Sequence, residues 1–344
     1  MFIKTISRNF SQITSFQVEQ LHNRSLVKLS GEDIRSFLQG LITNDVNILY
    51  NKKVNSLFTF FLNSKGRILY DVLLLKKNDH EILLDCDLSI KNNLLRHLKI
   101  HRLRKKVDIE EVNSNLWAIF NDKFVNENLF KFDGTFCTKA YMDRHELDYE
   151  ELKNNLQDEN IYVFKDPRLH VLGYRVVSCP SIDVVKIMTD KGIDVNKTND
   201  YIVFRYKLGV AEGVRELPLG NCFPLEANCD YLNGVSFHKG CYIGQELTAR
   251  IHHTGTVRKR LMPLILSSSV PESECDRDLI ITIGENKVGK LRGIYKTYGI
   301  ALLRLTGVLE NTSNLRISGI SASTYKPFWW PQELNENRTT VLIS

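Results

Sequence analysis

The sequence has no long apolar run. Its most apolar stretch, LFTFFLN at 57–63, is far shorter than the 18 or more residues that a membrane-spanning helix needs, so no membrane span is expected. A strong charge of one sign is also missing, because 46 basic and 40 acidic residues give a net charge of only +6. This excess suits an acidic partner or a polyanionic ligand, but it is much weaker than that of nucleic-acid-binding proteins, so we expect no nucleic-acid partner.

Paired cysteines are absent as well. None of the seven cysteines lies in a CxxC pair, and their number is odd, which argues against a disulfide framework and a structural zinc ribbon. We expect a reducing compartment and free thiols, most of them packed in the core. The cysteines are Cys86, Cys137, Cys179, Cys222, Cys229, Cys241 and Cys275.

Acidic residues are missing from the first 18 positions, although they are frequent from Glu19 onward. The same stretch contains Lys4, Arg8 and several serines and threonines, and its apolar residues recur at helical spacing. This composition is typical of a mitochondrial transit peptide, which we predict over residues 1–18 without fixing a cleavage site. The alternative is an N-terminus that is basic by chance.

What remains is ordinary globular composition, with 43% hydrophobic and 25% charged residues in a chain long enough for two or three domains. A strand at 25–29 leads into an amphipathic helix, and three strands follow between 54 and 86, two of them joined by a turn at 63–66. A helix and two further strands follow. This order predicts an α+β fold with ferredoxin-like sandwich subdomains rather than a doubly wound sheet.

From about Val257 the pattern changes to short strands separated by glycine turns. This change predicts a small antiparallel β-barrel, with a domain boundary near Gly255. We therefore expect a larger domain over residues 19–255 and the barrel over 256–344.

Two charged features stand out before the barrel. Asp71 lies in a strongly apolar strand, so its carboxylate must face water or have a specific partner. The stretch HLKIHRLRKK at 97–106 is densely basic. It is either a solvated face or a contact for an anion or an acidic partner.

The stretch SFHKGCYIGQELTARIHH at 236–253 contains a single cysteine, Cys241, between two glycines. Gly240 and Gly244 flank Cys241, and a short helix is predicted to follow, with Glu246 and Arg250 spaced to pair. His238 and Lys239 precede the cysteine, and Tyr242 and Gln245 follow it. This setting, at a helix start and beside a lysine, favours the thiolate form of Cys241.

A thiolate serves as a nucleophile, a redox partner or a soft metal ligand, and an inert structural thiol is the alternative. No cysteine-protease signature accompanies Cys241. Iron–sulfur clusters are normally held by four cysteines. If Cys241 binds such a cluster, a second protein must therefore supply the other ligands.

The segment KGCYIGQELTAR at 239–250 closely resembles the signature of the YgfZ/GcvT family, the folate-binding, glycine-cleavage T-protein-like proteins. LSGEDIRSFLQGLITNDV (29–46), NSKGRILYDVLL (63–74), RLRKKVDI (102–109) and PFWWP (327–331) resemble further family segments in order. The stretch 212–241 is most similar to the eukaryotic mitochondrial branch. The resemblance covers most of residues 25–335 and implies a T-protein/aminomethyltransferase-like fold.

The resemblance also implies roles for single residues. Cys241 occupies the position of the cysteine that the family requires, and Asp71 that of a carboxylate beside the folate amine in aminomethyltransferases. Lys207, in RYKLG, stands where those enzymes have a glutamate that grips the pteridine. A cation cannot accept the pteridine hydrogen bonds, which argues against glycine-cleavage activity.

The resemblance implies an assembly factor rather than a metabolic enzyme. It would act in the mitochondrial matrix with A-type scaffold proteins in the maturation of [4Fe-4S] proteins such as aconitase and lipoate synthase. Cys241 would be a thiolate ligand of a transiently shared cluster, supported by Lys239, His238 and Arg250, and the chain alone would be a monomer. One alternative is a tetrahydrofolate-dependent one-carbon transferase that uses Asp71, and another is thiol–disulfide exchange at Cys241.

Overall fold

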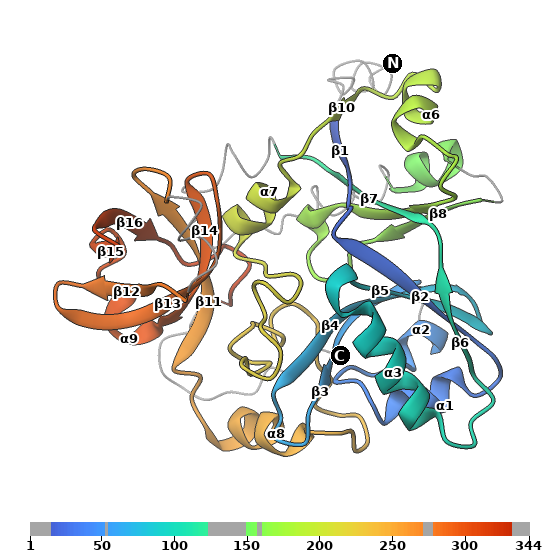
Figure 1. The fold of residues 1–344 in the computed structure, drawn as a ribbon, viewed down its shortest axis with the longest axis horizontal. Helices are drawn as coiled ribbons and strands as arrows, with labels where there is room; N and C mark the ends of the chain where they lie inside the picture. Colours follow the sequence, from blue (N-terminus) through green and yellow to red (C-terminus); the bar gives the residue numbers. More distant parts are fainter. Residues whose placement is uncertain (1–14, 52–53, 123–148, 157–159, 271–277, 332–344) are drawn as a thin grey trace, which may run out of the picture.

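The computed structural model describes residues 15–51, 54–122, 149–156, 160–270 and 278–331. Within these ranges two β-sheets with their helices and one closed barrel meet around a common centre (Figure 1). This arrangement confirms the predicted α+β class and the predicted C-terminal barrel.

The N-terminal sheet is antiparallel, with strand order β3-β4-β5-β2-β6. Its side chains alternate between two cores, as the period of a strand requires. On β4, Val72 and Leu74 pack with the helices, whereas Leu73 and Leu75 face the centre of the molecule. The strands are β2 (Arg24–Ser30), β3 (Ser56–Leu62), β4 (Ile68–Asn78), β5 (Glu81–Asp87) and β6 (Asp108–Val112). The helices are α1 (Ile34–Gln39), α2 (Ile48–Asn51), η1 (Leu88–Ile90) and α3 (Lys91–Arg102).

The turn between β3 and β4 forms where the sequence predicts it. Gly66 has φ +73°, a left-handed conformation that glycine adopts at little cost. The Asn63 side-chain oxygen accepts hydrogen bonds from the backbone N–H groups of Lys65 and Arg67, at 2.9 and 3.0 Å. Asn63 therefore fixes this turn, to which the cysteine motif is anchored below.

The second sheet has strand order β10-β1-β7-β9-β8, and only the β1–β10 pair is parallel. Its first strand begins at Phe16, and Val18 is fully buried. The expected boundary at residue 18 therefore falls inside a strand, because the folded body already includes residues 16–18. The elements are β1 (Phe16–Gln20), β7 (Asn115–Phe120), β8 (Ile161–Lys165), η2 (His170–Leu172), β9 (Tyr174–Ser178), α6 (Val184–Asp190), β10 (Val195–Lys197) and α7 (Tyr201–Leu208).

After α8 (Gln245–Thr254) the chain enters a closed barrel with strand order β11-β14-β13-β12-β15-β16. Because the barrel is closed, it has no edge strand whose backbone N–H and C=O groups would be left unpaired. Arg260 ties the barrel to the rest of the molecule through a two-point ion pair with Asp230, with both distances 2.8 Å. The elements are β11 (Lys259–Leu266), β12 (Ile280–Ile283), β13 (Asn286–Tyr295), β14 (Tyr298–Arg304), α9 (Leu305–Val308), β15 (Leu315–Ile317) and β16 (Ile320–Thr324).

Candidate functional site

Cys241 lies in the loop before α8, and it is the one exposed cysteine among the residues that the structure describes. Cys86, Cys222 and Cys229 are buried, and burial raises the pKa of Cys86 to about 12 and that of Cys222 to about 11. These buried thiols stay protonated near neutral pH, as core thiols do. Cys179 is half-buried, and Cys137 and Cys275 lie outside the described residues.

The sequence predicts that Lys239 favours the thiolate form of Cys241. In the structure its ammonium group instead anchors the loop. Its Nζ donates to three backbone carbonyl oxygens, those of Gln39 (2.8 Å), Ile42 (2.7 Å) and Asn44 (2.7 Å). An ammonium group has three N–H donors, so all of them are used. Burial lowers the pKa of Lys239 to about 8. Lys239 therefore positions the loop rather than neutralising charge at Cys241.

A second anchor follows the cysteine. The Ile243 N–H donates to the Gly40 carbonyl at 3.1 Å, and Gly244 adopts φ +79° against the turn at Asn63. A methyl group on Gly244 would lie 2.3 Å from the Asn63 carbonyl oxygen, which no side chain tolerates. Gly240 differs, because a methyl group there would meet no atom within 4 Å. The loop is thus fixed on both sides of an open Gly240–Cys241 tip.

The helix after the loop forms as predicted. Glu246 and Arg250 pair at 2.5 Å on its solvent face, where an exposed pair stabilises the helix only slightly. The Gln245 side-chain oxygen accepts from the Tyr242 N–H at 3.1 Å and closes the turn into the helix. The ring of half-buried Tyr242 lies 5.0 Å from the ammonium of Lys239.

The histidines around the motif do not form a metal site in the described part of the chain. No group of three or more His, Cys, Asp or Glu residues there is placed to hold a metal ion. His252 instead stacks on Phe237, with ring centroids 3.5 Å apart, and His238 is exposed near the same segment. A metal ion or cluster at Cys241 would therefore need ligands from another molecule.

Asp71 lies far inside the molecule, with only 4% of its surface exposed. Its Oδ2 accepts from the Gly213 N–H at 3.1 Å and from Arg24 Nη1 at 3.4 Å. The sequence left open whether this carboxylate faces water or a specific partner, and in the structure it meets Arg24 together with a backbone N–H group.

Asp71 belongs to a buried network of charges where the two sheets meet. Arg24 also bonds to Asp85 at 2.6 Å, and Arg205 forms a two-point ion pair with Glu216 at 2.8 and 3.0 Å. Burial alone would raise the pKa of Glu212, but nearby arginines hold it well below its usual range. The remaining members are Asp166, Arg168 and Arg175.

This network was not predicted from the sequence, because its members come from strands, loops and helix α7, which are far apart in the chain. Breaking one buried ion pair would leave an uncompensated charge in a medium of low dielectric constant, which strongly destabilises the fold. The network therefore fixes how the two sheets meet. Lys207, where aminomethyltransferases carry a glutamate, is half-buried with its ammonium 4.8 Å from the Tyr298 ring. Burial lowers the pKa of this lysine.

Comparison with known proteins identifies the family. Residues 258–332 match the family model described as CAF17, C-terminal beta-barrel domain. The chain is 33% identical over 330 residues to the mitochondrial iron-sulfur cluster assembly factor IBA57 of Mus musculus, covering 91% of this chain and 85% of that protein. The chain belongs to the IBA57 family. The Homo sapiens member is 32% identical over 327 residues with the same coverage, and the Dictyostelium discoideum homolog is 33% identical over 281 residues, covering 74% of this chain and 64% of that protein.

These IBA57 relatives are named as mitochondrial proteins, which supports the predicted mitochondrial localisation. Among solved structures, the glycine cleavage system aminomethyltransferase T from Bartonella henselae aligns with a TM-score of 0.67 over 92% of this chain and 87% of that one. At 13% identity this likeness concerns the fold alone, and it confirms the predicted T-protein-like fold. No helix in the described ranges is long and apolar enough to cross a membrane.

Proposed function

We propose that this chain is an assembly factor for iron–sulfur clusters in the mitochondrial matrix. In this role Cys241 supplies one thiolate ligand to a cluster that an A-type scaffold protein shares with it transiently. The observation that carries the proposal is an exposed cysteine on a rigidly anchored loop, in a chain that belongs to the IBA57 family.

The number of available ligands supports a shared cluster. Clusters of this kind are commonly held by four cysteine thiolates, yet Cys241 is the one exposed thiol in the described ranges. The cluster is therefore cargo rather than a resident cofactor, and the remaining ligands come from the partner. Clients of the [4Fe-4S] type, such as aconitase and lipoate synthase, remain part of the proposal.

The anchored loop gives this ligand a fixed direction. Lys239 holds one side of the loop by three hydrogen bonds, and Gly244 seats the other side against the β3–β4 turn. Only Gly240 and Cys241 project between these anchors. A preorganised thiolate loses little conformational entropy when a partner's cluster binds, which favours rapid and reversible sharing.

The test mixes the purified protein with a cluster-loaded A-type scaffold under anaerobic conditions. Visible absorption and the size of the complex are recorded for the wild type, Cys241→Ala and a control, Cys179→Ala, which removes a half-buried thiol. We expect a cluster-bridged complex for the wild type and the control only. If Cys241→Ala forms the same complex, the proposed role is wrong, and a link cleaved by dithiothreitol but not by an iron chelator would indicate thiol exchange instead.

The folate-dependent alternative finds little support in the geometry. The Asp71 oxygen that bonds to Gly213 also faces Arg24, and Lys207 offers donors where a pteridine needs an acceptor. The residues present therefore do not fit a folate in the way the aminomethyltransferase pattern requires, and we derive no step through it. Calorimetry with tetrahydrofolate checks this, since tight binding that Asp71→Asn weakens would restore the alternative.

A further inference from the structure

The segment that carries Cys241 is joined to the N-terminal sheet through two buried residues, Thr43 and Asn44. They lie in the loop between α1 and α2, and 0% and 3% of their surfaces are exposed. Their hydrogen bonds extend to strand β3 on one side and to residues 233–239 on the other. We call these two residues the 43–44 pair.

Thr43 uses a single hydroxyl group in both directions. The hydroxyl accepts from the Phe60 N–H on β3 at 3.0 Å and donates to the Gly234 carbonyl oxygen at 2.6 Å. The backbone of Thr43 repeats the pattern, because its N–H donates to the Phe60 carbonyl oxygen at 3.0 Å and its carbonyl oxygen accepts from the Ser236 N–H at 3.1 Å. Thr43 therefore connects the edge of β3 to the segment before the cysteine.

Asn44 makes a second connection through its side-chain amide. Its Nδ2 donates to the Phe58 carbonyl oxygen on β3 at 2.8 Å and to the Asn233 carbonyl oxygen at 2.7 Å. Both N–H donors of the amide are therefore used. The backbone carbonyl oxygen of Asn44 is also one of the three acceptors of Lys239, at 2.7 Å. Asn44 thus contacts both the start of the segment and the lysine that anchors it.

The cysteine segment also packs directly on β3. A methyl group on Gly234 would lie 3.0 Å from the Cδ1 atom of Phe58 and 3.2 Å from the Cε2 atom of Phe60. Non-bonded carbon atoms normally pack about 3.5–4.0 Å apart, so a larger residue would push the segment away from the strand. This close approach allows the 43–44 pair to reach both the strand and the segment.

The 43–44 pair acts on Cys241 through the backbone. All residues that it bonds in this segment lie within eight positions before Cys241. Beyond the cysteine, Ile243 and Gly244 hold the other side of the loop. Loss of the hydrogen bonds of the pair would free only the first side, so the thiol would remain exposed but lose its fixed direction.

We propose that Thr43 and Asn44 are positioning residues for Cys241, which set the direction in which its thiolate meets a partner's cluster. They act through the backbone of residues 233–239 and not as ligands. This inference rests on the function proposed above, because the direction matters only if Cys241 takes part in cluster sharing. A ligand that is already oriented loses less entropy when the cluster binds, so disorder before Cys241 should weaken the complex.

Two variants remove the hydrogen bonds with little change in the size of the side chain. Thr43→Val replaces the hydroxyl with a methyl group, and Thr43→Ser is the conservative variant that keeps the hydroxyl. Asn44→Asp places an oxygen where Nδ2 faces the carbonyl oxygens of Phe58 and Asn233. If Asn44→Asp fails to fold, the comparison of Thr43→Val with Thr43→Ser still decides the question.

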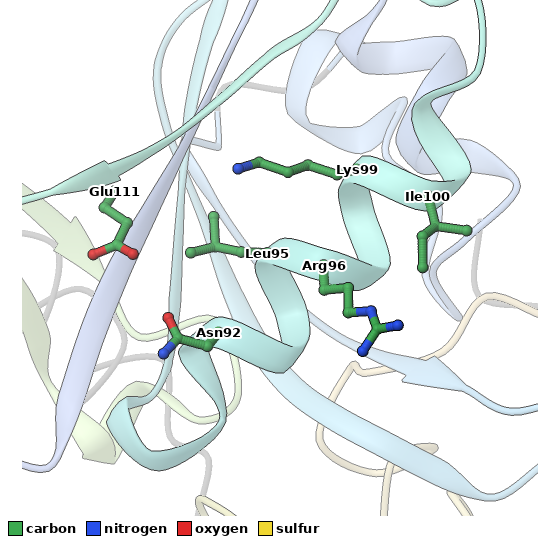
Figure 2. A pocket seen from close by; sticks show the side chains of 6 residues that line it. All are labelled: Asn92, Leu95, Arg96, Lys99, Ile100 and Glu111. Atoms are coloured by element: carbon green, nitrogen blue, oxygen red, sulfur yellow. The ribbon is translucent and has the colours of Figure 1, made fainter.

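Each variant has a matched control away from the cysteine segment. Thr324→Val, in β16 of the barrel, removes a buried hydroxyl that donates to the Pro263 carbonyl oxygen, also at 2.6 Å. It shows whether the loss of a comparable buried hydrogen bond is sufficient by itself. Asn92→Asp introduces the same charge as Asn44→Asp, but at an exposed position near the start of α3 (Figure 2).

The first measurement is made on the full-length protein without a partner. Hydrogen exchange over residues 236–243, followed by mass spectrometry, should be at least tenfold faster in Thr43→Val and Asn44→Asp than in the wild type. Thr43→Ser and both controls should change it less than twofold. Unchanged exchange in Thr43→Val overturns the positioning role, whether or not Cys241 binds a cluster.

The second measurement adds a cluster-loaded A-type scaffold under anaerobic conditions. The visible circular dichroism of the shared cluster should change in Thr43→Val and Asn44→Asp, because it depends on how the ligands are arranged around the iron atoms. The dissociation constant of their complexes should rise about tenfold. Faster exchange with wild-type dichroism and affinity overturns the proposal, as does an equal loss of affinity in Thr324→Val. Failure of the proposed function is seen separately, when Cys241→Ala forms the same complex as the wild type.

Discussion

Replacing Gly240 or Gly244, the two glycines around Cys241, with alanine should have very different effects on the stability of the protein. At Gly244 a methyl group meets the Asn63 carbonyl oxygen at 2.3 Å and the Leu62 Cβ at 2.9 Å, on a backbone with φ +79°. At Gly240 it meets no atom within 4 Å. The left-handed conformation costs alanine about 1–2 kcal/mol, and displacing packed neighbours adds about 1–3 kcal/mol. We therefore expect Gly244→Ala to lower the free energy of unfolding by about 2–5 kcal/mol, and Gly240→Ala to lower it by less than about 0.5 kcal/mol.

Urea unfolding, followed by the fluorescence of the intrinsic tryptophans, measures both variants against the wild type. Hydrogen exchange over residues 236–254 then shows whether Gly244→Ala loosens the loop locally rather than the whole fold. A Gly244→Ala variant with wild-type stability and wild-type exchange would refute the anchoring role of this glycine. An equal loss in Gly240→Ala would show that the conformation around Cys241 differs from the one described.

Three further changes test other contacts. Lys239→Met removes three hydrogen bonds and should speed exchange of the Ile243 amide proton at least tenfold, as measured by mass spectrometry. Burial, with a contribution from a neighbouring histidine, lowers the pKa of His97 to about 4, so its neutral form is favoured and stability is lost as pH falls from about 6.5 towards 4. Between pH 7 and pH 5, the free energy of unfolding of His97→Gln, measured by urea titration, should therefore fall by about 1 kcal/mol less than that of the wild type. This value is discounted for the partial exposure of His97. Arg260→Met leaves Asp230 without its ion-pair partner and should lower the free energy of unfolding by about 3 kcal/mol. The barrel should then unfold at a lower urea concentration than in the wild type.

Much of the fold could be predicted from local patterns. The turn at Asn63–Gly66, the strongly apolar strand that contains Val72–Leu75, and the glycine-punctuated strands after Val257 depend mainly on neighbouring residues, so apolar runs and turn chemistry indicate them. Strand β8 was missed, although its Ile161–Phe164 run is rich in residues that favour strands. The start of the folded body was placed too late, because Phe16 pairs with a strand formed near residue 195.

The candidate site was predicted only in part. The framing of Cys241 by glycines and the Glu246–Arg250 pair follow from short spacings in the sequence. The role of Lys239 does not, because its three acceptors lie about 200 residues earlier in the chain. For Asp71 the sequence predicted either water or a specific partner, and Arg24 and Gly213 reach it only when three segments meet.

The sequence by itself determined the fold class, the family resemblance and which cysteine is candidate for chemistry, because these depend on composition, short motifs and local periodicity. The tertiary structure alone decided that Lys239 and Gly244 hold the loop, that Asp71 joins a buried network of charges, and that Cys241 stays exposed. These properties depend on which distant segments come into contact, and on which surfaces the fold leaves uncovered.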